Sequence, residues 1–295
     1  MADYVLCTSS TADLSREHLE KIGVPYVCFH YELGGKSYMD DLWTTMEPHA
    51  FYQRMLNGEE SRTSQVNMTE YTEFWRPFLQ EGKDIIHLTL SSGISGTVNS
   101  ARAAAEELRK EYPGREICVV DSLAASSGFG LLVDKLAELR DQGYSLKELY
   151  RYAEDHKLYV HHWFFSSDLT FYIRGGRVSK TAGFFGRMLN ICPLLNVDYQ
   201  GRLIPRDKIR TKKKVIREIV ARMEEHAQNG YDYHEKVFIS YSDCLEDAQA
   251  VAALIEQKFP KIRGGVQLFP IGSTIGAHTG PGTVALFFWG DLRSN

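Results

Sequence analysis

The stretch "LTLSSGISGTVNSA", residues 88–101, runs from a short apolar strand pattern through a turn rich in glycine and hydroxyl groups into a helix pattern. The helix is indicated by Val98, Ala101, Ala105 and Leu108, which share one face. A strand, a tight turn and an amphipathic helix in direct succession are typical of a parallel sheet covered by helices. The stretch therefore predicts an α/β fold.

The same alternation surrounds this stretch. Buried strands are expected at residues 4–8, 26–33, 84–90 and 116–121, with amphipathic helices between and after them. Ser145 and Glu148 predict a capping box for a helix that runs to about residue 156. We expect residues 1–156 to form an N-terminal α/β domain whose parallel sheet has helices on both faces.

Residues 157–295 predict a second α/β domain. Strands are expected at 157–165, 193–197, 202–210, 236–241, 266–270 and 283–289, helices at 215–228 and 245–259, and glycine turns at 175–176 and 183–186. The hairpin around "DYQG", residues 198–201, indicates antiparallel neighbours. We expect a mixed sheet in this C-terminal domain.

Composition excludes several classes of protein. The chain has 295 residues, 43% hydrophobic and 24% charged, with a net charge of only -4, which gives no general attraction to nucleic acid or to an anionic membrane. The apolar run at 284–289 is too short to span a bilayer, and the N-terminus lacks a secretory pattern. The five cysteines are odd in number and widely spaced, as expected for reduced thiols. We expect a cytoplasmic protein without integral membrane association.

Hydroxyl groups follow two of the predicted strands. At the first, free backbone N–H groups and the side chains of Ser91, Ser92, Ser95 and Thr97 predict an anion pocket, although Ser95 or Thr97 could instead cap the helix. The stretch "DSLAASSGFG", residues 121–130, repeats the pattern. Because ligands bind at the carboxyl ends of parallel strands, both turns should line one crevice.

Two further stretches carry candidate site residues. "SRTSQV", residues 61–66, places Thr63 between two helix patterns, as a helix-capping loop or as part of a site. "IGAHTGPGTVALFFW", residues 275–289, predicts His278 in a glycine turn ahead of an apolar strand. A serine hydrolase with Ser95 as nucleophile and His278 as base is an alternative, but Thr97 replaces the last glycine of the nucleophile elbow.

No cofactor or metal is predicted. The chain lacks Gly-x-Gly-x-x-Gly after the first strand and lacks a Gly-Lys-Ser/Thr phosphate loop. Asp40 and Asp41 are expected to be solvated loop residues. His161 and His162 are neighbours in a strand and point to opposite faces, so they cannot jointly bind one ion. Asp232 and His234 lie at no recognised ligand spacing.

The stretch at residues 202–217 has eight basic residues in sixteen and one acid. Its Lys212, Lys213 and Lys214 stand at the start of a predicted helix, where the helix dipole disfavours positive charge. This placement indicates either a docking surface for a partner or a solvated face.

Seven motifs in this order resemble the DegV family over nearly the whole chain: "TSSTADL" (8–14), "TSQ" (63–65), "SSGISGT" (91–97), "DSLAAS" (121–126), "IRGGRVSK" (173–180), "LNICPLLNVDYQGRL" (189–203) and "HTGPG" (278–282). The resemblance implies a protein that binds a long-chain fatty acid between its two domains and is similar to the lipid-binding subunit of bacterial fatty acid kinase. It implies that Thr63, Ser95 and His278 bind the carboxylate, with Arg177 and Thr97 near the headgroup or the mouth.

The implied role is that of a carrier without kinase chemistry of its own, which presents the headgroup to a separate kinase subunit. A lipid-sensing regulatory protein is the other alternative. Two positions depart from the family pattern. Ser9 stands where the family usually has aspartate, so a role tied to that acid does not transfer. Val66 and Asn67 follow the "TSQ" motif where proline is common, and this loop is expected to differ in shape.

Overall fold

The computed structural model describes residues 3–179 and 191–294, and the turn expected at 183–186 lies outside them. The α-helices are α1 (Arg16–Lys21), α2 (Pro48–Leu56), α3 (Met68–Gln80), α4 (Thr97–Glu111), α5 (Ser127–Asp141), α6 (Leu146–His156), α7 (Thr170–Arg174), α8 (Lys212–His226), α9 (Leu245–Lys258) and α10 (Ser273–Thr279). The strands are β1 (Tyr4–Ser9), β2 (Tyr26–Val27), β3 (His30–Leu33), β4 (Lys36–Met39), β5 (Ser61–Ser64), β6 (Asp84–Thr89), β7 (Ile117–Asp121), β8 (Val160–Ser166), β9 (Ile191–Val197), β10 (Leu203–Arg210), β11 (Val237–Tyr241), β12 (Val266–Pro270) and β13 (Thr283–Trp289).

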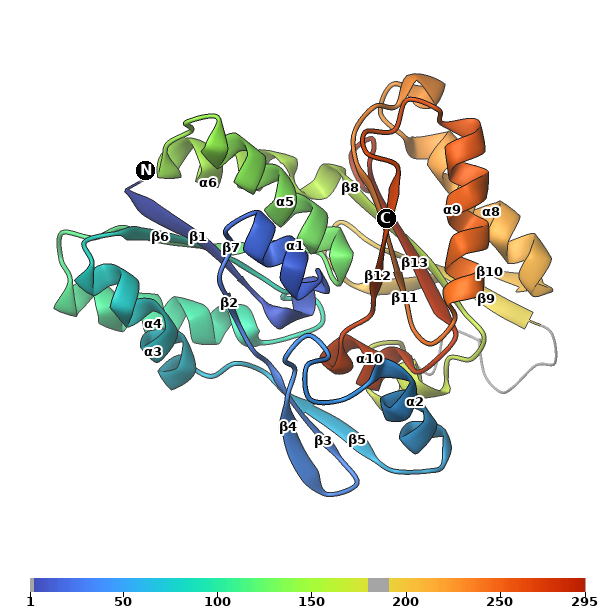
Figure 1. Ribbon diagram of the computed structural model, residues 1–295, viewed down its shortest axis with the longest axis horizontal. Helices are drawn as coiled ribbons and strands as arrows, with labels where there is room; N and C mark the ends of the chain where they lie inside the picture. Colours follow the sequence, from blue (N-terminus) through green and yellow to red (C-terminus); the bar gives the residue numbers. More distant parts are fainter. Residues whose placement is uncertain (1–2, 180–190, 295) are drawn as a thin grey trace.

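The first sheet is parallel, with the strand order β2-β1-β6-β7. Helices α5 and α6 pack on one face and α3 and α4 on the other (Figure 1). The predicted parallel sheet with helices on both faces is confirmed. The capping box at Ser145 and Glu148 is also present, at the start of α6.

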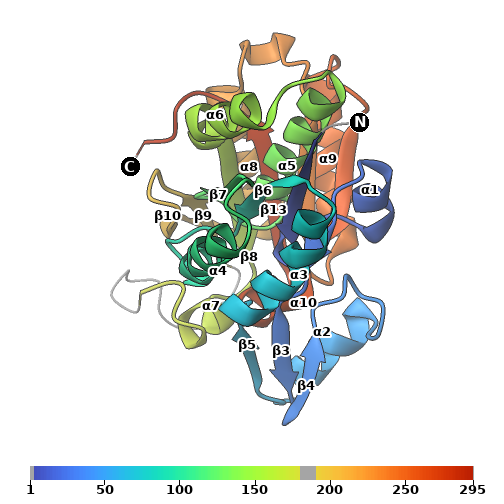
Figure 2. The ribbon, with the colours of Figure 1, turned by 90° about the vertical axis from the view of Figure 1, so that its left-hand side faces the viewer.

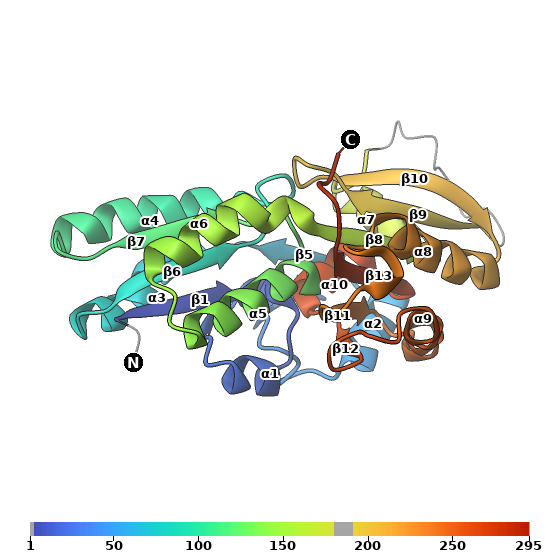
Figure 3. The same ribbon diagram turned by 90° about the horizontal axis from the view of Figure 1, so that it is seen from above.

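The second sheet has six strands in the order β10-β9-β8-β13-β11-β12. Its pairs are antiparallel except β11 with β12, so the predicted mixed sheet is confirmed. Helices α8 and α9 pack against its strands, and α5 reaches across from the first sheet to contact β8, β11 and β13. Because it touches both sheets, α5 is buried all round in its first half, residues 127–134. Seen from above, the two sheets lie at opposite ends of the molecule (Figure 3).

A third, antiparallel sheet has the order β4-β3-β5 and lies with α2 at one end of the molecule (Figure 2). Tyr31, Phe51 and Tyr52 form its small core together with Ala277 of α10, a helix more than 200 positions away in the sequence. The first part of the chain thus contributes a small layer that packs against the last helix. A domain division near residue 157 stays a prediction.

Three local predictions were wrong. The strand expected at 26–33 is two strands, because β2 pairs with β1 whereas β3 leaves that sheet to pair with β4 and β5. Residues 61–64 are strand β5, not a capping loop, since Thr63 pairs with Tyr31 across the small sheet. The glycine turn expected around His278 is the end of helix α10.

Among the described residues, no helix combines the length and the apolar composition needed to cross a membrane.

Candidate functional site

A cavity of about 500 Å³ lies where the carboxyl ends of the parallel strands face the mixed sheet and α10. Most of its surface is apolar, from side chains such as Phe29, Leu90, Ile94, Phe164, Ile271 and Phe287. Polar groups reach it from Thr63, Gln65, Ser92, Ser95, Ser126, His162, Arg177, Thr274, His278, Thr279 and Thr283. The size and the few polar groups are typical of a small-molecule site.

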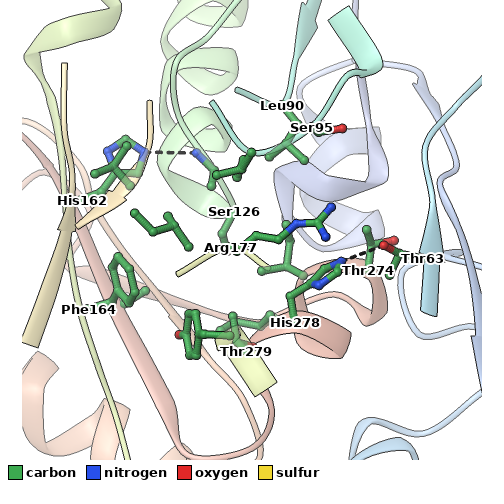
Figure 4. A pocket seen from close by; sticks show the side chains of 18 of the residues that line it. Thr63, Leu90, Ser95, Ser126, His162, Phe164, Arg177, Thr274, His278 and Thr279 are labelled. Atoms are coloured by element: carbon green, nitrogen blue, oxygen red, sulfur yellow. Dashed lines mark hydrogen bonds between the residues drawn. The ribbon is translucent and has the colours of Figure 1, made fainter. Parts of the chain in front are cut away.

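One polar cluster joins three distant segments (Figure 4). The hydroxyl of Thr63 on β5 lies 2.7 Å from Nε2 of His278 on α10. Arg177, which follows α7, points its guanidinium toward this pair in the view of Figure 4. Burial, together with the charge of Arg177, lowers the pKa of His278 to about 4. The imidazole is therefore neutral at neutral pH.

The surroundings of His278 favour one tautomer. Its Nδ1 is buried without a hydrogen-bond partner and lies so close to Gly175 that a Cβ there would be 2.3 Å away. A buried N–H without a partner is rarer than an unpaired acceptor, so the proton belongs on Nε2. Nε2–H then donates to Thr63, and the Thr63 proton is free to point into the cavity. Position 175 must be glycine, because any Cβ there would clash with Nδ1 of His278.

Arg177 brings positive charge into an apolar cavity. Its Nη1 donates to the carbonyl of Gly175 at 2.5 Å, and no carboxylate of the described residues forms an ion pair with it. Burial lowers its pKa from the usual value, which reflects the cost of this position. A half-buried cation without an anionic partner is stabilised when an anion binds beside it.

Both predicted hydroxyl turns line the cavity, as expected. Ser92 and Ser95 reach it from the turn after β6, and Ser126 reaches it from the turn after β7. The first turn is held against the β9–β10 hairpin, because Ser91 Oγ donates to the carbonyl of Gly201 at 2.8 Å. The N-cap of α4 is Gly96, so neither Ser95 nor Thr97 is the N-cap residue, although Ser95 Oγ accepts from the N–H of Thr97, the first residue of the helix, at 3.3 Å.

His162 lines the part of the cavity opposite the Thr63–His278 pair, and neither of its ring nitrogens is free to bind a ligand. Nδ1 of His162 contacts the carbonyl of Val160 at 2.9 Å, which requires a proton on Nδ1, and Nε2 accepts from the N–H of Ala125 at 3.4 Å. Burial lowers the pKa of this histidine well below its usual value. With both nitrogens satisfied, the ring presents an effectively apolar surface near Phe164 (Figure 4) and against Phe287, whose ring centroid lies 5.2 Å away.

Sequence reasoning missed two buried acids that hold α10 in place. Asp13 accepts from the N–H of Gly272 at 3.0 Å and from Ser126 Oγ at 2.5 Å. Asp40 accepts from the hydroxyls of Ser273 at 2.8 Å and Ser10 at 3.1 Å, so the expectation that Asp40 is a solvated residue was wrong. Burial raises the pKa of both carboxyls. Both acids are marked by their burial, and Asp13 also by its positive φ, but neither signal is visible in the sequence.

The structure brings together Thr63, Ser95, Arg177 and His278 around one cavity. The expectation that Thr97 lies near the headgroup or the mouth was wrong. Thr97 is fully buried, its hydroxyl lies 2.8 Å from that of Tyr71, and it does not line the cavity. Lys212 forms an ion pair with Asp247 at 2.8 Å, whereas Lys213 and Lys214 are exposed. The three lysines lie away from the cavity lining, at the start of α8.

Comparison with known proteins gives a consistent family. The profile described as "Uncharacterised protein, DegV family" matches residues 4–291. A DegV domain-containing protein from Clostridium perfringens is 35% identical over 293 residues, covering 99% of both chains. The structure of a DegV family protein from Thermus thermophilus, described as fatty acid binding, has a TM-score of 0.86 and 29% identity and covers 97% of this chain and 99% of its own. The Streptococcus pneumoniae fatty acid kinase B3 protein, loaded with linoleic acid, shares the fold, with a TM-score of 0.83, 20% identity and coverage of 99% and 100%.

Proposed function

The chain belongs to the DegV family, and from this premise we propose that it binds a long-chain fatty acid with the acyl chain in the apolar cavity and the carboxylate at the polar cluster. DegV family proteins bind fatty acids, as the Thermus thermophilus protein does. The observation that carries the proposal is Arg177, a cation with no anionic partner among the described residues, which lies beside the Thr63–His278 pair in a mostly apolar cavity.

The chemistry of the cavity fits a ligand with one charged end. Thr63 and Ser95 offer hydroxyl donors, and Arg177 offers charge. Each buried methylene contributes about 0.8 kcal/mol, so a common acyl chain contributes on the order of 10 kcal/mol before the costs of binding are subtracted. The apolar lining and the satisfied nitrogens of His162 suit the chain end.

A serine hydrolase is not favoured by the geometry. Nε2 of His278 carries the proton in the assigned tautomer and contacts Thr63, so it cannot act as a base toward Ser95, whose Oγ accepts from the N–H of Thr97 at 3.3 Å. A nucleophile needs a base within hydrogen-bond reach, and Ser95 lacks such a contact with His278. We therefore propose a cytoplasmic carrier without chemistry of its own. A lipid-sensing role would use the same cavity.

The test is mass spectrometry of ligand released from denatured protein, followed by affinity measurements on single variants. We expect a long-chain fatty acid to co-purify. Thr63→Val and Ser95→Ala should each weaken fatty acid binding by about tenfold to a hundredfold, because a hydrogen bond to a charged group contributes about 1.5 to 3 kcal/mol. Thr72→Val is the matched control, because Thr72 is a partly exposed threonine outside the cavity whose hydroxyl donates to the carbonyl of Met68 within α3. Unchanged affinity in both site variants would contradict the proposal.

We further propose that a separate kinase subunit docks at the start of α8, in line with the name of the Streptococcus pneumoniae protein. Lys213 and Lys214 are exposed there, on a helix whose first turn holds no acid. The double reversal Lys213→Glu and Lys214→Glu should slow association with the kinase at low salt and leave fatty acid affinity unchanged. Lys147→Glu on α6 is the control. Equal association rates for the reversal variant and the wild type would exclude this surface.

A further inference from the structure

Outside the cavity, the mixed sheet carries a second cluster of ionisable groups on its other face. His162 and Phe287 line the cavity, and neighbouring residues in a strand point to opposite faces. His161 and Phe288 therefore face the layer of α8, where their rings stack at 5.2 Å. His226, the last residue of α8, stacks on His161 with ring centroids 4.8 Å apart.

Asp291, just after β13, completes this cluster. Its Oδ1 lies 2.9 Å from Nε2 of His161 and 3.2 Å from Nδ1 of His226. The possible metal-binding atoms of these three side chains all lie within 4.8 Å of one another. Among the described residues, no other three histidine, cysteine or acidic side chains come together in this way. The three come from positions 65 to 130 residues apart, which is why the spacing in the sequence gave no sign of them.

We propose that His161, His226 and Asp291 bind one divalent transition-metal ion, with Zn²⁺ as the expected occupant. Two imidazole nitrogens and one carboxylate oxygen are a ligand set that zinc accepts. With metal–ligand bonds of about 2.0 to 2.1 Å, ligand atoms at the corners of a tetrahedron are about 3.3 Å apart. The two nitrogen–oxygen distances are already close to that value, but the group as a whole spans 4.8 Å, so the rings must also close by up to about 1.5 Å. Nε2 of His161, which also lies 2.9 Å from the main-chain carbonyl of Asp291, must release that contact to bind the ion.

The surroundings of the three ligands support a cation. His226 ends α8, and the carbonyl end of a helix carries partial negative charge. Glu225 places a carboxylate oxygen 3.8 Å from Nε2 of His226, on the side of the ring away from the proposed ion. Of the neighbouring cations, Arg222 pairs with Asp207, Glu218 and Glu225. Arg293 donates to main-chain carbonyls, but its charge still acts on His161 and opposes a cation there, so the negative groups must outweigh it.

The three side chains differ in solvent exposure, and the most exposed of them leaves solvent access to the proposed ion. The side chains of His161, His226 and Asp291 are 7%, 24% and 63% exposed. Solvent can therefore complete the coordination on the side of Asp291. A bound ion would join β8, the end of α8 and the segment after β13, and it would stabilise the mixed sheet without touching the cavity.

The experiment uses the full chain, without a histidine tag, freed of fatty acid and treated with chelator. Zn²⁺ is titrated into the wild type, His226→Gln and Asp291→Asn. His49→Gln is the control, because His49 pairs with Asp243 and no third ligand joins them among the described residues. We expect one Zn²⁺ per chain, affinity at least about tenfold weaker in both site variants, and wild-type affinity in the control. Co²⁺ in place of Zn²⁺ should give the visible absorption of nitrogen and oxygen ligation.

Thermal unfolding separates loss of the site from loss of the fold. Zn²⁺ should raise the Tm of the wild type, and the rise should be absent in His226→Gln and Asp291→Asn, while their fatty acid affinity stays that of the wild type. Absence of stoichiometric Zn²⁺ binding to the wild type would overturn the proposal. Equal Zn²⁺ affinity in the wild type and both site variants would do the same, whatever the outcome for fatty acid.

Discussion

The hydroxyl of Thr63 has one proton, and the direction in which it points depends on whether Nε2 of the neighbouring His278 is protonated. If Nε2 carried no proton, Thr63 would have to donate to it at 2.7 Å and could not donate to a ligand. With the proton on Nε2, His278 supports Thr63 and Thr63 serves the ligand. The histidine is then a positioning residue in the unliganded protein, and its neutral state follows from burial and from Arg177.

An anionic ligand should change the titration of His278. A bound anion favours the protonated ring, so it raises the pKa of His278 above the unliganded value of about 4. Binding should be tightest at low pH, weaken as the pH rises from about 4 to the pKa of the complex, and be constant above it. His278→Gln keeps an N–H donor without a titrating group, so its profile should be flat and its affinity at neutral pH only modestly lower.

The measurement is the dissociation constant against pH, with a long-chain alkyl sulfonate in place of the fatty acid. The sulfonate stays charged throughout, so the ligand contributes no titration. His49→Gln, on the exposed surface, should reproduce the wild-type profile. Superimposable profiles for His278→Gln and wild type would show that His278 does not sense the headgroup.

The sequence predicted single site residues where a motif was local. The turn around Ser95 could be read directly because strand, turn and helix are contiguous, and family resemblance named Thr63, Arg177 and His278. Thr97 was wrong, because its hydroxyl turns to Tyr71, a partner 26 positions away. Asp13 and Asp40 were missed because burial by distant segments leaves no local pattern.

Helix α10 shows how an element depends on contacts from far away. It has seven residues, too few to be stable alone, and it carries His278 at its end. Asp13 accepts from the N–H of Gly272, and Asp40 accepts from Ser273, so two buried carboxyls fix its first turn. The position of the headgroup cluster depends on this anchor.

Replacing Asp13 tests the anchor. Burial raises the pKa of Asp13, so the free energy of unfolding of the wild type should fall as the pH rises from about 4, the value in the unfolded chain, toward the folded pKa. Asp13→Asn keeps the acceptor for Gly272, and Ser126 can redirect its proton to Ser240, 3.1 Å away. The variant should lose less stability with rising pH than the wild type does.

Urea unfolding over a series of pH values measures this difference. Asp141→Asn, an exposed acid beside Arg140, serves as the control and should follow the wild type. The stability of Asp13→Asn relative to the wild type should increase with pH. Parallel curves for Asp13→Asn and the wild type would mean that Asp13 is charged without cost in the folded protein.

Elements with strong local patterns were predicted and the others were not. The hairpin of β9 and β10 and the capping box of α6 follow from turn and cap residues. Strand β5 reads "SRTS", which lacks apolar alternation, and it is a strand only because β3 pairs with it. Helix α10 begins after Gly272 without a capping side chain, so its start was invisible.

At the scale of the whole molecule, the cavity exists because a helix and turns connect the two sheets at fixed points. Helix α5 packs against both, and the turn after β6 rests on the β9–β10 hairpin. The parallel and the mixed sheet could each be predicted from periodicity. Their relative placement could not, because it depends on contacts between segments about 100 positions apart, such as Ser91 with Gly201.

Gly93 lies at one of these meeting points and allows a test. A Cβ at Gly93 would lie 2.5 Å from the carbonyl oxygen of Gly201 and 2.7 Å from that of Gln200, and main-chain atoms cannot rotate away. In Gly93→Ala the turn that carries Ser95 and the hairpin must move apart. We expect a loss of stability of about 1 to 3 kcal/mol and weaker fatty acid binding, since the cavity wall opens.

Gly114→Ala is the matched control, because a Cβ there meets nothing within 4 Å and the backbone does not require glycine. Its stability should equal or slightly exceed that of the wild type, since alanine restricts the unfolded chain. Unfolding and fatty acid affinity are measured on both variants. A loss of stability with wild-type affinity in Gly93→Ala would mean that the turn is needed for packing only. Loss of both would mean that the contact between the two sheets sets the shape of the cavity where Ser95 meets the ligand.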